Sequence, residues 1–414
     1  MANLQPVRGT RDIHPDERQR HRFIEETARN VAARYGYTEI STPIFEFSEV
    51  FKRTLGDTSD IVTKEMYTFE DKGGDEITLR PEGTAGVARM LISGGLAQDL
   101  PLKYFYRGPM FRYERPQKGR FRQFHQTGIE LLGVPEPLGD VEVIALGASV
   151  LNELGLLSKT TLELNTLGNA ESRNSYREKL IAYFNDFRSD LSEDSQDRLE
   201  RNPLRILDSK DKQDQNIVAN APEFSESLDG ESKEFFAAVT EGLDVLSIAY
   251  RLNSRLVRGL DYYCHTAFEF TTWELGTQGT VLAGGRYDGL VGQMGGTSTA
   301  GVGWAAGIER LAMLAEDIPE EVRPIAIIPV VPELQDKSLE IAQDLRSRGF
   351  TIEFGYRGNM SRRLKRANKL NAIASVIIGP DELERGAATV RNLDSGDQQE
   401  VSLEVLADHL KQFS

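Results

Sequence analysis

Residues 111–130, FRYERPQKGRFRQFHQTGIE, contain a dense group of anion-binding side chains. Five basic residues fall within eleven positions and are opposed only by Glu114: Arg112, Arg115, Lys118, Arg120 and Arg122. An arginine fork binds a phosphate through two parallel hydrogen bonds and never loses its charge. The whole chain has a formal net charge of −15, which argues against a protein that coats nucleic acid. The pattern therefore indicates a local site for an anionic ligand.

Two strand-like runs carry these arginines and further polar side chains on one face. Alternate residues of a strand face the same way, so residues 122–133 bring together Phe124, Gln126, Gly128 and Glu130. Residues 101–114 do the same with Tyr106, Gly108, Met110, Arg112 and Glu114. A ring that can stack on a base, an amide, a carboxylate and an arginine, with glycines between them, are typical of a site floor. The alternative is that the charges form the solvated tip of a hairpin.

The segment LRPEGTAGVARM places a carboxylate and small polar residues between a strand and a helix. Glu82, Gly83 and Thr84 can receive an amino group there, or they can simply cap the helix. The glycines of AGGRYDG lack the strand–GxGxxG–helix context of a dinucleotide site, and the chain has no GxxxxGK[ST] motif. Any bound nucleotide is therefore not held by a Rossmann turn or a P-loop.

Two further segments offer arginines. VRGLDYY contains Arg258, Tyr262 and Tyr263, and GIERL places Arg310 at the start of a helix. Taken singly, the first segment is equally typical of packing with a surface charge, and Arg310 of an ion pair with Glu309. The alternation of the strand after Tyr263 puts His265 on the same face, so a role at the site and a packing role both stay open for it.

Composition narrows the class of protein further. The one cysteine, Cys264, cannot form an intramolecular disulfide, and the five histidines show no zinc-ligand spacing. We therefore expect no metal site. The first residues lack the apolar run of a signal peptide, and the strongly apolar stretch 325–331 is too short to span a bilayer. We expect a cytoplasmic protein.

Periodicity predicts the elements that position these residues. A helix is expected from Pro15 to Gly36, followed by a strand that reaches Pro43 and a second helix. Strand-like runs at 65–71, 75–82, 101–114 and 122–133 favour an antiparallel sheet. Residues 140–157 read as a helix and 160–168 as a strand. Glycine-rich and aromatic strands return at 257–272 and 279–296.

The chain is expected to be an α+β protein with three parts. A core of residues 1–168 and 254–322 is interrupted by a helical insertion at 169–253, and residues 323–414 alternate strand and helix as a small α/β domain. In that last domain, four basic residues repeat with helical spacing, away from Met360, Leu364 and Ala367: Arg362, Lys365, Arg366 and Lys369. They form a basic helix face for nucleic acid, or a solvated one.

Taken together, these motifs closely resemble the histidyl-tRNA synthetase family of class II aminoacyl-tRNA synthetases. GYTEISTPIFE, with Pro43, resembles motif 1, FRYERPQKGRFRQFHQ motif 2 and GIERL motif 3, while LRPEGTA and VRGLDYY resemble the histidine-specific stretches. The resemblance covers nearly the whole chain. It implies a class II antiparallel sheet flanked by helices, a helical insertion and a C-terminal anticodon-binding domain. It also implies a homodimer joined through motif 1.

The resemblance implies that ATP and Mg2+ activate L-histidine as histidyl-adenylate, and that the histidine is then transferred to the 3′-terminal adenosine of tRNA(His). The implied ATP-binding residues are Arg112 at the α-phosphate, Phe124 and Glu114 at adenine, Arg120, and Arg310 at the far phosphates. Arg258 would flank the α-phosphate, which makes Arg112, Arg258 and Arg310 the catalytic set.

The implied histidine-binding residues are those that hold the ends of the amino acid and those that read its imidazole. They are Glu82, Gly83, Thr84, Arg112, Gln126, Glu130, Arg258, Tyr262 and Tyr263. A neutral imidazole has one donor and one acceptor, which a carboxylate and a phenol can satisfy. For tRNA, the resemblance implies Arg115, Gln117 and Lys118 in the motif 2 loop and the basic face Arg362, Lys365, Arg366 and Lys369.

The main alternative is a regulatory paralogue that serves ATP phosphoribosyltransferase in histidine biosynthesis and does not charge tRNA. Such paralogues resemble only the catalytic core and lose parts of the ATP and histidine motifs, whereas this chain keeps those motifs and the C-terminal domain. A binding or sensor module without catalysis is less well supported, because no kinase segment accompanies the motifs.

Overall fold

The structure is a computed structural model that describes residues 4–55, 61–117, 119–209, 211–257, 262–276 and 279–413. The chain divides into two compact units, Met1–Ile318 and Pro319–Ser414. Both contain helices and strands, which confirms the α+β class. Among the described residues, no helix combines the length and the apolar character that crossing a membrane requires.

An eight-stranded sheet forms the centre of the first unit. Its order is β1 (Thr38–Ile40), β5 (Leu102–Phe111), β6 (Gln123–Leu132), β11 (Gly301–Gly307), β10 (Thr280–Arg286), β9 (Cys264–Thr271), β7 (Thr161–Thr166) and β8 (Arg251–Leu252). All neighbours are antiparallel except the two outer pairs, β1 with β5 and β7 with β8. The predicted antiparallel sheet is therefore confirmed.

The register of β5 against β6 confirms the predicted site face. Tyr106 lies opposite Gly128, and Met110 lies opposite Phe124. The side chains of both strands that alternation assigned to one face therefore belong to the same face of the sheet.

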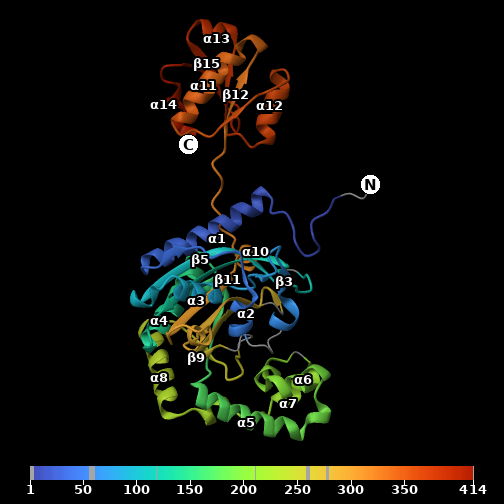
Figure 1. Ribbon diagram of the computed structural model, residues 1–414. Coiled ribbons are helices and arrows are strands. Elements are labelled where there is room, and N and C mark those ends of the chain that lie inside the picture. The colour runs from blue at the N-terminus through green and yellow to red at the C-terminus, as the bar shows by residue number, and fades with distance from the viewer. Residues whose placement is uncertain are drawn as a thin grey trace. The chain divides into compact units, whose positions relative to one another are not determined.

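Helices cover the sheet and enclose its main core. The helix α1 (Pro15–Arg34) begins at the predicted proline and ends before Gly36, whose φ of 82° only glycine adopts without strain. Its buried residues Ile24, Ala28 and Val31 share a core with α4 (Pro137–Glu153) and α10 (Ile308–Leu314). Figure 1 shows α1 lying across the sheet above β5. The predicted helix 140–157 thus begins at Pro137 and ends at Glu153.

A second, three-stranded sheet corrects two expectations. It has the order β2 (Phe45–Phe47), β4 (Glu76–Leu79), β3 (Tyr67–Glu70). The expected strand that reaches Pro43 is wrong, because β1 and β2 belong to different sheets. The four strand-like runs also do not form one sheet, because β3 and β4 lie in the three-stranded sheet and β5 and β6 in the eight-stranded sheet. The bend between β1 and β2 is fixed by Arg80, whose Nη1 donates to the Thr42 carbonyl at 2.9 Å. Proline has no N–H to continue the ladder. The helix α2 (Ser48–Leu55) packs on this sheet, and α3 (Thr84–Ser93) and α9 (Leu290–Gln293) pack with α2.

Residues 170–245 are mainly helical, and the part before Gly230 has its own small core. Its helices are α5 (Ala170–Asp186), α6 (Glu193–Arg201), α7 (Lys212–Val218) and α8 (Gly230–Val245). Tyr176, Leu180, Phe184, Leu199 and Ile206 pack together inside it. Of the four helices, α8 contacts α4 and β9 of the sheet unit, whereas α5, α6 and α7 gather as the green group in Figure 1.

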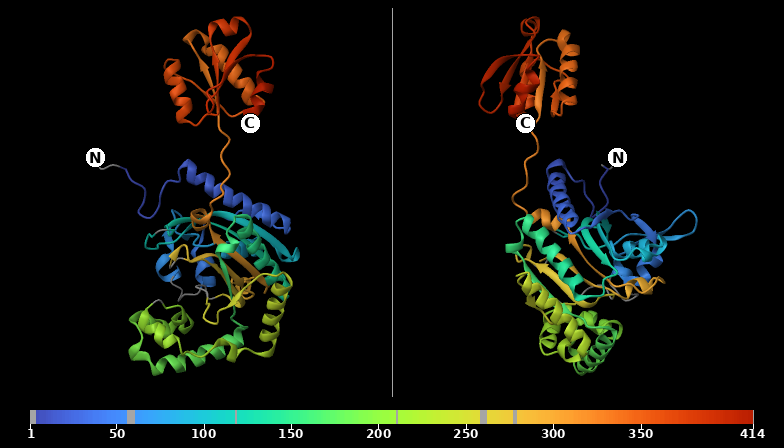
Figure 2. Two further views of the ribbon diagram at one scale, coloured as in Figure 1. Left: turned by 180° about the vertical axis from the view of Figure 1, so that it is seen from behind. Right: turned by 90° about the vertical axis from the view of Figure 1, so that its left-hand side faces the viewer.

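The second unit is a five-stranded sheet with helices on both faces, as the right-hand view of Figure 2 shows. Its order is β13 (Ile352–Phe354), β12 (Ile325–Pro329), β14 (Ala374–Ile378), β15 (Ala387–Asn392) and β16 (Gln398–Ser402). Ile325 and Ile327 pack toward α11 (Gln335–Ser347), while Ala326 and Ile328 pack toward α12 (Met360–Lys369). The predicted α/β alternation is confirmed for the parallel strands. The antiparallel strands β15 and β16 and the helices α13 (Pro380–Glu384) and α14 (Leu406–Leu410) follow this alternation and were not predicted.

Candidate active site

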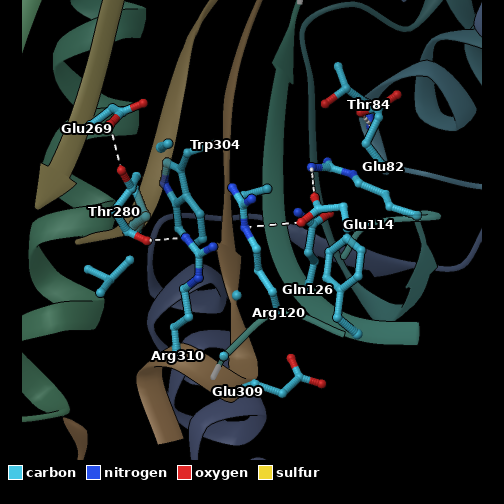
Figure 3. Close-up of a pocket in the computed structure, with 18 of the residues that line it drawn as sticks. Glu82, Thr84, Glu114, Arg120, Gln126, Glu269, Thr280, Trp304, Glu309 and Arg310 are labelled. Atoms are coloured by element: carbon cyan, nitrogen blue, oxygen red, sulfur yellow. Dashed lines mark hydrogen bonds and ion pairs between the residues drawn. The ribbon is translucent and has the colours of Figure 1, made fainter. Parts of the chain in front are cut away.

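A pocket on the eight-stranded sheet brings most of the predicted site residues together. Its lining comes from β6, β9, β10, β11, α3, α10 and the loop between β5 and β6, and it includes Glu82, Thr84, Arg112, Glu114, Arg120, Phe124, Gln126, Tyr262, Tyr263 and Arg310. Figure 3 shows Glu82 and Thr84 on one side of it and Arg310 on the other. Arg258 and Lys118 lie outside the described residues.

Arg112 stands at the end of β5 with its orientation fixed by two contacts. Its Nε donates to the Pro81 carbonyl at 2.9 Å, and its guanidinium carbon lies 5.2 Å from the centre of the Phe124 ring. The first contact holds the stem, and the second is a cation–π contact within the usual limit of about 6 Å. A ring and a guanidinium are thus placed side by side on the pocket floor.

Arg310 faces them from the start of α10. Its Nη1 donates to the Thr280 carbonyl at 2.7 Å, and Thr280 in turn donates to Glu269 at 2.8 Å (Figure 3). Burial lowers the pKa of Arg310, and the positive charges of Arg120 and Arg112 lower it further. A guanidinium stays charged at any physiological pH, so these groups create a site that attracts an anion.

Glu114 lies between two of the arginines. Arg120 Nε is 3.1 Å from Glu114 Oε2, although the pair is not aligned as a hydrogen bond, and Arg112 Nη1 is 3.9 Å from Glu114 Oε1. The two other predicted loop residues, Arg115 and Gln117, are exposed and do not line the pocket. Arg115 and Gln117 therefore fit the interpretation of a solvated hairpin tip, whereas Arg112 and Arg120 line the pocket.

Glu82 caps α3 while it lines the pocket. Its two carboxylate oxygens accept hydrogen bonds from the backbone N–H groups of Thr84 at 2.7 Å and Ala85 at 2.8 Å. Burial raises the pKa of Glu82, and these hydrogen bonds oppose that rise. The capping interpretation and the binding interpretation are therefore compatible at this residue.

Glu130 is buried behind the pocket lining, where three hydroxyl groups bind it. It accepts hydrogen bonds from Thr84 Oγ1 at 2.7 Å, Tyr106 Oη at 3.3 Å and Tyr287 Oη at 2.5 Å. Burial raises its pKa to about 8, although the three hydroxyls work against that rise. Sequence reasoning missed the partners Tyr106 and Tyr287. The only signals were the place of Tyr106 on the site face and that of Tyr287 in AGGRYDG.

The glycines of the site face accommodate protein side chains. A Cβ atom at Gly128 would lie 2.6 Å from the Tyr106 ring and one at Gly83 2.3 Å from it, while one at Gly108 would lie 2.5 Å from Arg80 Nη2. The expectation that Gly108 and Gly128 clear space on the floor is therefore corrected. They allow Tyr106 and Arg80 to lie flat against the sheet.

Apart from the Glu114 and Arg120 atoms that face each other as an ion pair, two buried polar atoms in the lining have no hydrogen-bond partner in the part of the chain that the structure describes. They are Tyr262 Oη and Gln126 Oε1. Tyr262 packs on Tyr263, which also lines the pocket, with 4.6 Å between the ring centres. Buried polar groups in native proteins are nearly always paired, so these atoms mark where a polar ligand group fits.

His265 does not share the face of Tyr263. Its φ of 44° breaks the strand alternation, and its ring packs 4.7 Å from Phe235 of α8. Of the two interpretations left open for this residue, the structure supports packing.

The basic face of α12 is exposed on the second unit. Arg362, Lys365 and Lys369 point to solvent, and Arg366 also pairs with Glu353 at 2.9 Å. Ala367 and Arg363 are buried on the opposite side. The predicted division between a basic face and a packed face is confirmed.

Comparison with known proteins agrees with this geometry. A family model described as histidyl-tRNA synthetase matches residues 9–311, and one described as an anticodon-binding domain matches residues 324–413. The histidine–tRNA ligase of Rhodospirillum rubrum is 59% identical over the full length of both chains, and that of Gluconacetobacter diazotrophicus is 54% identical over 99% of each. The apo histidyl-tRNA synthetase of S. aureus has a TM-score of 0.83 and 34% identity, covering 99% of this chain and 100% of that one. This chain belongs to the histidyl-tRNA synthetase family.

Proposed function

We propose that this protein is a histidine–tRNA ligase. A carboxylate oxygen of L-histidine attacks the α-phosphorus of ATP, pyrophosphate leaves, and histidyl-adenylate forms. A ribose hydroxyl of the 3′-terminal adenosine of tRNA(His) then attacks the activated carbonyl, and AMP leaves. The observation that carries the proposal is the pocket itself, which combines arginines from two sides with a stacking ring and unpaired polar atoms.

The ATP end of the pocket is assigned to its arginines. Arg112 would bind the α-phosphate and Arg310 the outer phosphates, with Arg120 beside them and Arg258 on the other side of the α-phosphate. Phe124 would stack on adenine, with Glu114 at its edge. Because the substrate carboxylate is already ionised, the first step needs no general base. Charge stabilisation and positioning at phosphorus are sufficient.

The histidine end is assigned to the residues around α3 and β6. Glu82 and Thr84, next to Gly83, would bind the amino group, and Gln126 would bind near the carboxylate. Glu130 and Tyr263 would read the imidazole, with Tyr262 beside them. A site built to pair both ring nitrogens leaves its own groups unpaired with an apolar amino acid, which allows discrimination of about four orders of magnitude.

Magnesium would accompany the ATP phosphates. The residues present fit such an ion, because Glu114 and Glu269 are carboxylates in the lining and oxygen is the ligand that Mg2+ takes. When bound, the ion neutralises phosphate charge.

For tRNA, we assign the exposed loop residues Arg115, Gln117 and Lys118 to the acceptor end and the α12 face to the anticodon region. We also assign residues 1–168 and 254–322 to the catalytic core, 169–253 to an inserted module and 323–414 to the anticodon-binding domain. The separate core of α5, α6 and α7 supports the second of these assignments for the residues before α8, whereas α8 packs in the main core and β8 pairs in the central sheet.

We further propose a homodimer joined through the segment around Pro43. Support comes from the three-stranded sheet, where Phe45 is 57% exposed and Phe47 is 59% exposed on the outer strand β2. Phe69 of β3 lies on the same face of this sheet, because Phe47 and Phe69 are both paired with Ile77 of β4.

The decisive experiment is amino-acid-dependent ATP–pyrophosphate exchange, run with L-histidine and with each other amino acid. Exchange with histidine alone, followed by charging of tRNA(His), is the expected result. Histidine binding without exchange would instead favour the regulatory paralogue, and the arginines would then have lost their catalytic role.

A further inference from the structure

Three potential metal ligands from distant parts of the chain meet beside the pocket. His21 lies on α1, His125 on β6 and Glu309 at the start of α10. One ligand atom from each lies within 4.8 Å of the ligand atoms of the other two. The rings of the two histidines are 5.7 Å apart and meet edge to face. The three elements that carry these residues pack directly on one another.

His21 is the residue that packing alone does not explain. Its side chain is 0% exposed, and neither ring nitrogen has a hydrogen-bond partner among the residues described. The carboxylate of Glu17, one helical turn earlier, is 3.7 Å away and is already bound to Arg11. Burial lowers the pKa of His21 against the opposing charge of Glu309. Buried polar groups are nearly always paired, so the two ring nitrogens without a partner are the observation that points to a ligand here.

His125 and Glu309 are already paired with each other. His125 Nδ1 lies 2.8 Å from Glu309 Oε1, and the His125 backbone N–H also binds this carboxylate at 3.0 Å. These contacts fix the Glu309 carboxylate beside the His125 ring.

We propose that His21, His125 and Glu309 form a binding site for a divalent transition-metal cation of the zinc type. Two imidazoles and one carboxylate with an open fourth position are a recurrent zinc ligand set, and imidazole nitrogen disfavours Mg2+ and Ca2+. Tetrahedral bonds of about 2.0–2.1 Å separate ligand atoms by roughly 3.4 Å. A rotation of the side chains is therefore enough to close the site around an ion.

The position of the three residues would let an ion reach them and would connect the bound ion to the pocket. Glu309 lines the pocket, and His125 lines a separate surface depression together with Arg18 and Glu25. The chain neighbours of the two residues are themselves pocket residues, Phe124 on β6 and Arg310 on α10. A bound ion would join α1 to both elements and hold the ring and the guanidinium in fixed relation.

The test measures zinc binding to the full-length chain without ATP or Mg2+, after removal of metal with a chelator. Equilibrium dialysis with metal analysis gives the stoichiometry, and isothermal titration gives the affinity. We compare the wild type with His21→Gln, which keeps a polar side chain of similar size, and with His14→Gln, an exposed histidine outside the cluster. Cobalt is the second probe, because its visible spectrum reports nitrogen and oxygen ligands in four-coordinate geometry.

The expected result is one zinc ion per chain in the wild type and in His14→Gln, with affinity at least about 100-fold weaker in His21→Gln. Zinc should raise the unfolding temperature of the first two proteins and leave that of His21→Gln unchanged. Equal zinc binding by wild type and His21→Gln would overturn the proposal, since the ion would then sit elsewhere. So would the absence of stoichiometric zinc or of a four-coordinate cobalt spectrum in the wild type. None of these readouts depends on aminoacylation.

Discussion

Thr84, the first residue of α3, donates a hydrogen bond of 2.7 Å to Glu130 on β6. The same threonine offers its backbone N–H to Glu82 at 2.7 Å. One residue thus links the carboxylate of Glu82, which lines the pocket, to that of Glu130, which is buried behind the lining. Both carboxylates are buried, and burial raises the pKa of each. The start of α3 therefore joins the carboxylates of Glu82 and Glu130, which are far apart in the sequence.

The buried carboxyl of Glu130 should make stability depend on pH. Its pKa is about 8 in the folded protein against an ordinary 4.5, so the folded state keeps a proton that the unfolded state releases. The free energy of unfolding should then fall as pH rises from about 4.5 to about 8 and level off above that. Glu130→Gln cannot titrate, so its stability should fall less over this range. Urea unfolding of the ligand-free proteins at several pH values measures the difference.

Glu70→Gln removes an exposed carboxylate on β3 and serves as the control for the loss of one acidic side chain. Curves of wild type and Glu130→Gln that stay parallel between pH 5 and pH 8 would contradict a raised pKa at Glu130.

Arg310 should be needed for chemistry more than for folding. Arg310→Gln removes a guanidinium from the phosphate end of the pocket, so histidine-dependent ATP–pyrophosphate exchange should fall by about 100- to 1000-fold. The matched control is Arg20→Gln. Arg20 donates to the Ala315 carbonyl at 3.2 Å at the end of the same helix but does not line the pocket. The Arg20→Gln substitution should lower the unfolding temperature and largely preserve ATP–pyrophosphate exchange. Similar losses of exchange in both variants would show that Arg310 acts only through the position of α10.

The part of the site that sequence could predict is the part that depends on strand alternation. Phe124, Gln126 and Arg112 share a face because side chains on a strand repeat every two residues, and the register of β5 with β6 preserves that repeat. A φ of 44° at His265 shows where the rule fails, since one left-handed residue reverses the faces that follow.

The parts that sequence could not predict depend on contacts between distant segments. Tyr287 reaches Glu130 across 157 positions, and Glu309 reaches His125 across 184. No local spacing rule detects side chains brought together in this way, so histidine spacing could not reveal the cluster of His21, His125 and Glu309. Likewise, the space above Gly128 is filled by Tyr106 from the adjacent strand.

The basic face of α12 should contribute to tRNA binding through charge. Lys365→Gln with Lys369→Gln should weaken binding of tRNA(His) and reduce the slope of log affinity against log salt by about 0.7–0.9 for each phosphate that is no longer neutralised. Lys337→Gln is the control, because Lys337 is exposed on α11 and pairs with Glu340 at 2.6 Å. ATP–pyrophosphate exchange should be unchanged in all of these variants. A salt slope equal to that of the wild type would exclude this face from tRNA binding.

The outer strand β2 should form part of the surface between two copies of the chain. Its alternation places Glu46 inward, where Arg89 binds it at 2.6 Å, and so presents Phe45 and Phe47 together on the outside. An exposed apolar patch at the edge of a sheet is characteristic of an interaction surface. Phe47→Lys should therefore shift the protein from dimer to monomer at micromolar concentration, as measured by light scattering after size exclusion. Trp273→Lys, which alters an 88%-exposed side chain elsewhere on the same unit, should remain a dimer. A monomeric wild type, or equal dissociation by both substitutions, would rule out this surface, because the effect would then not depend on the patch.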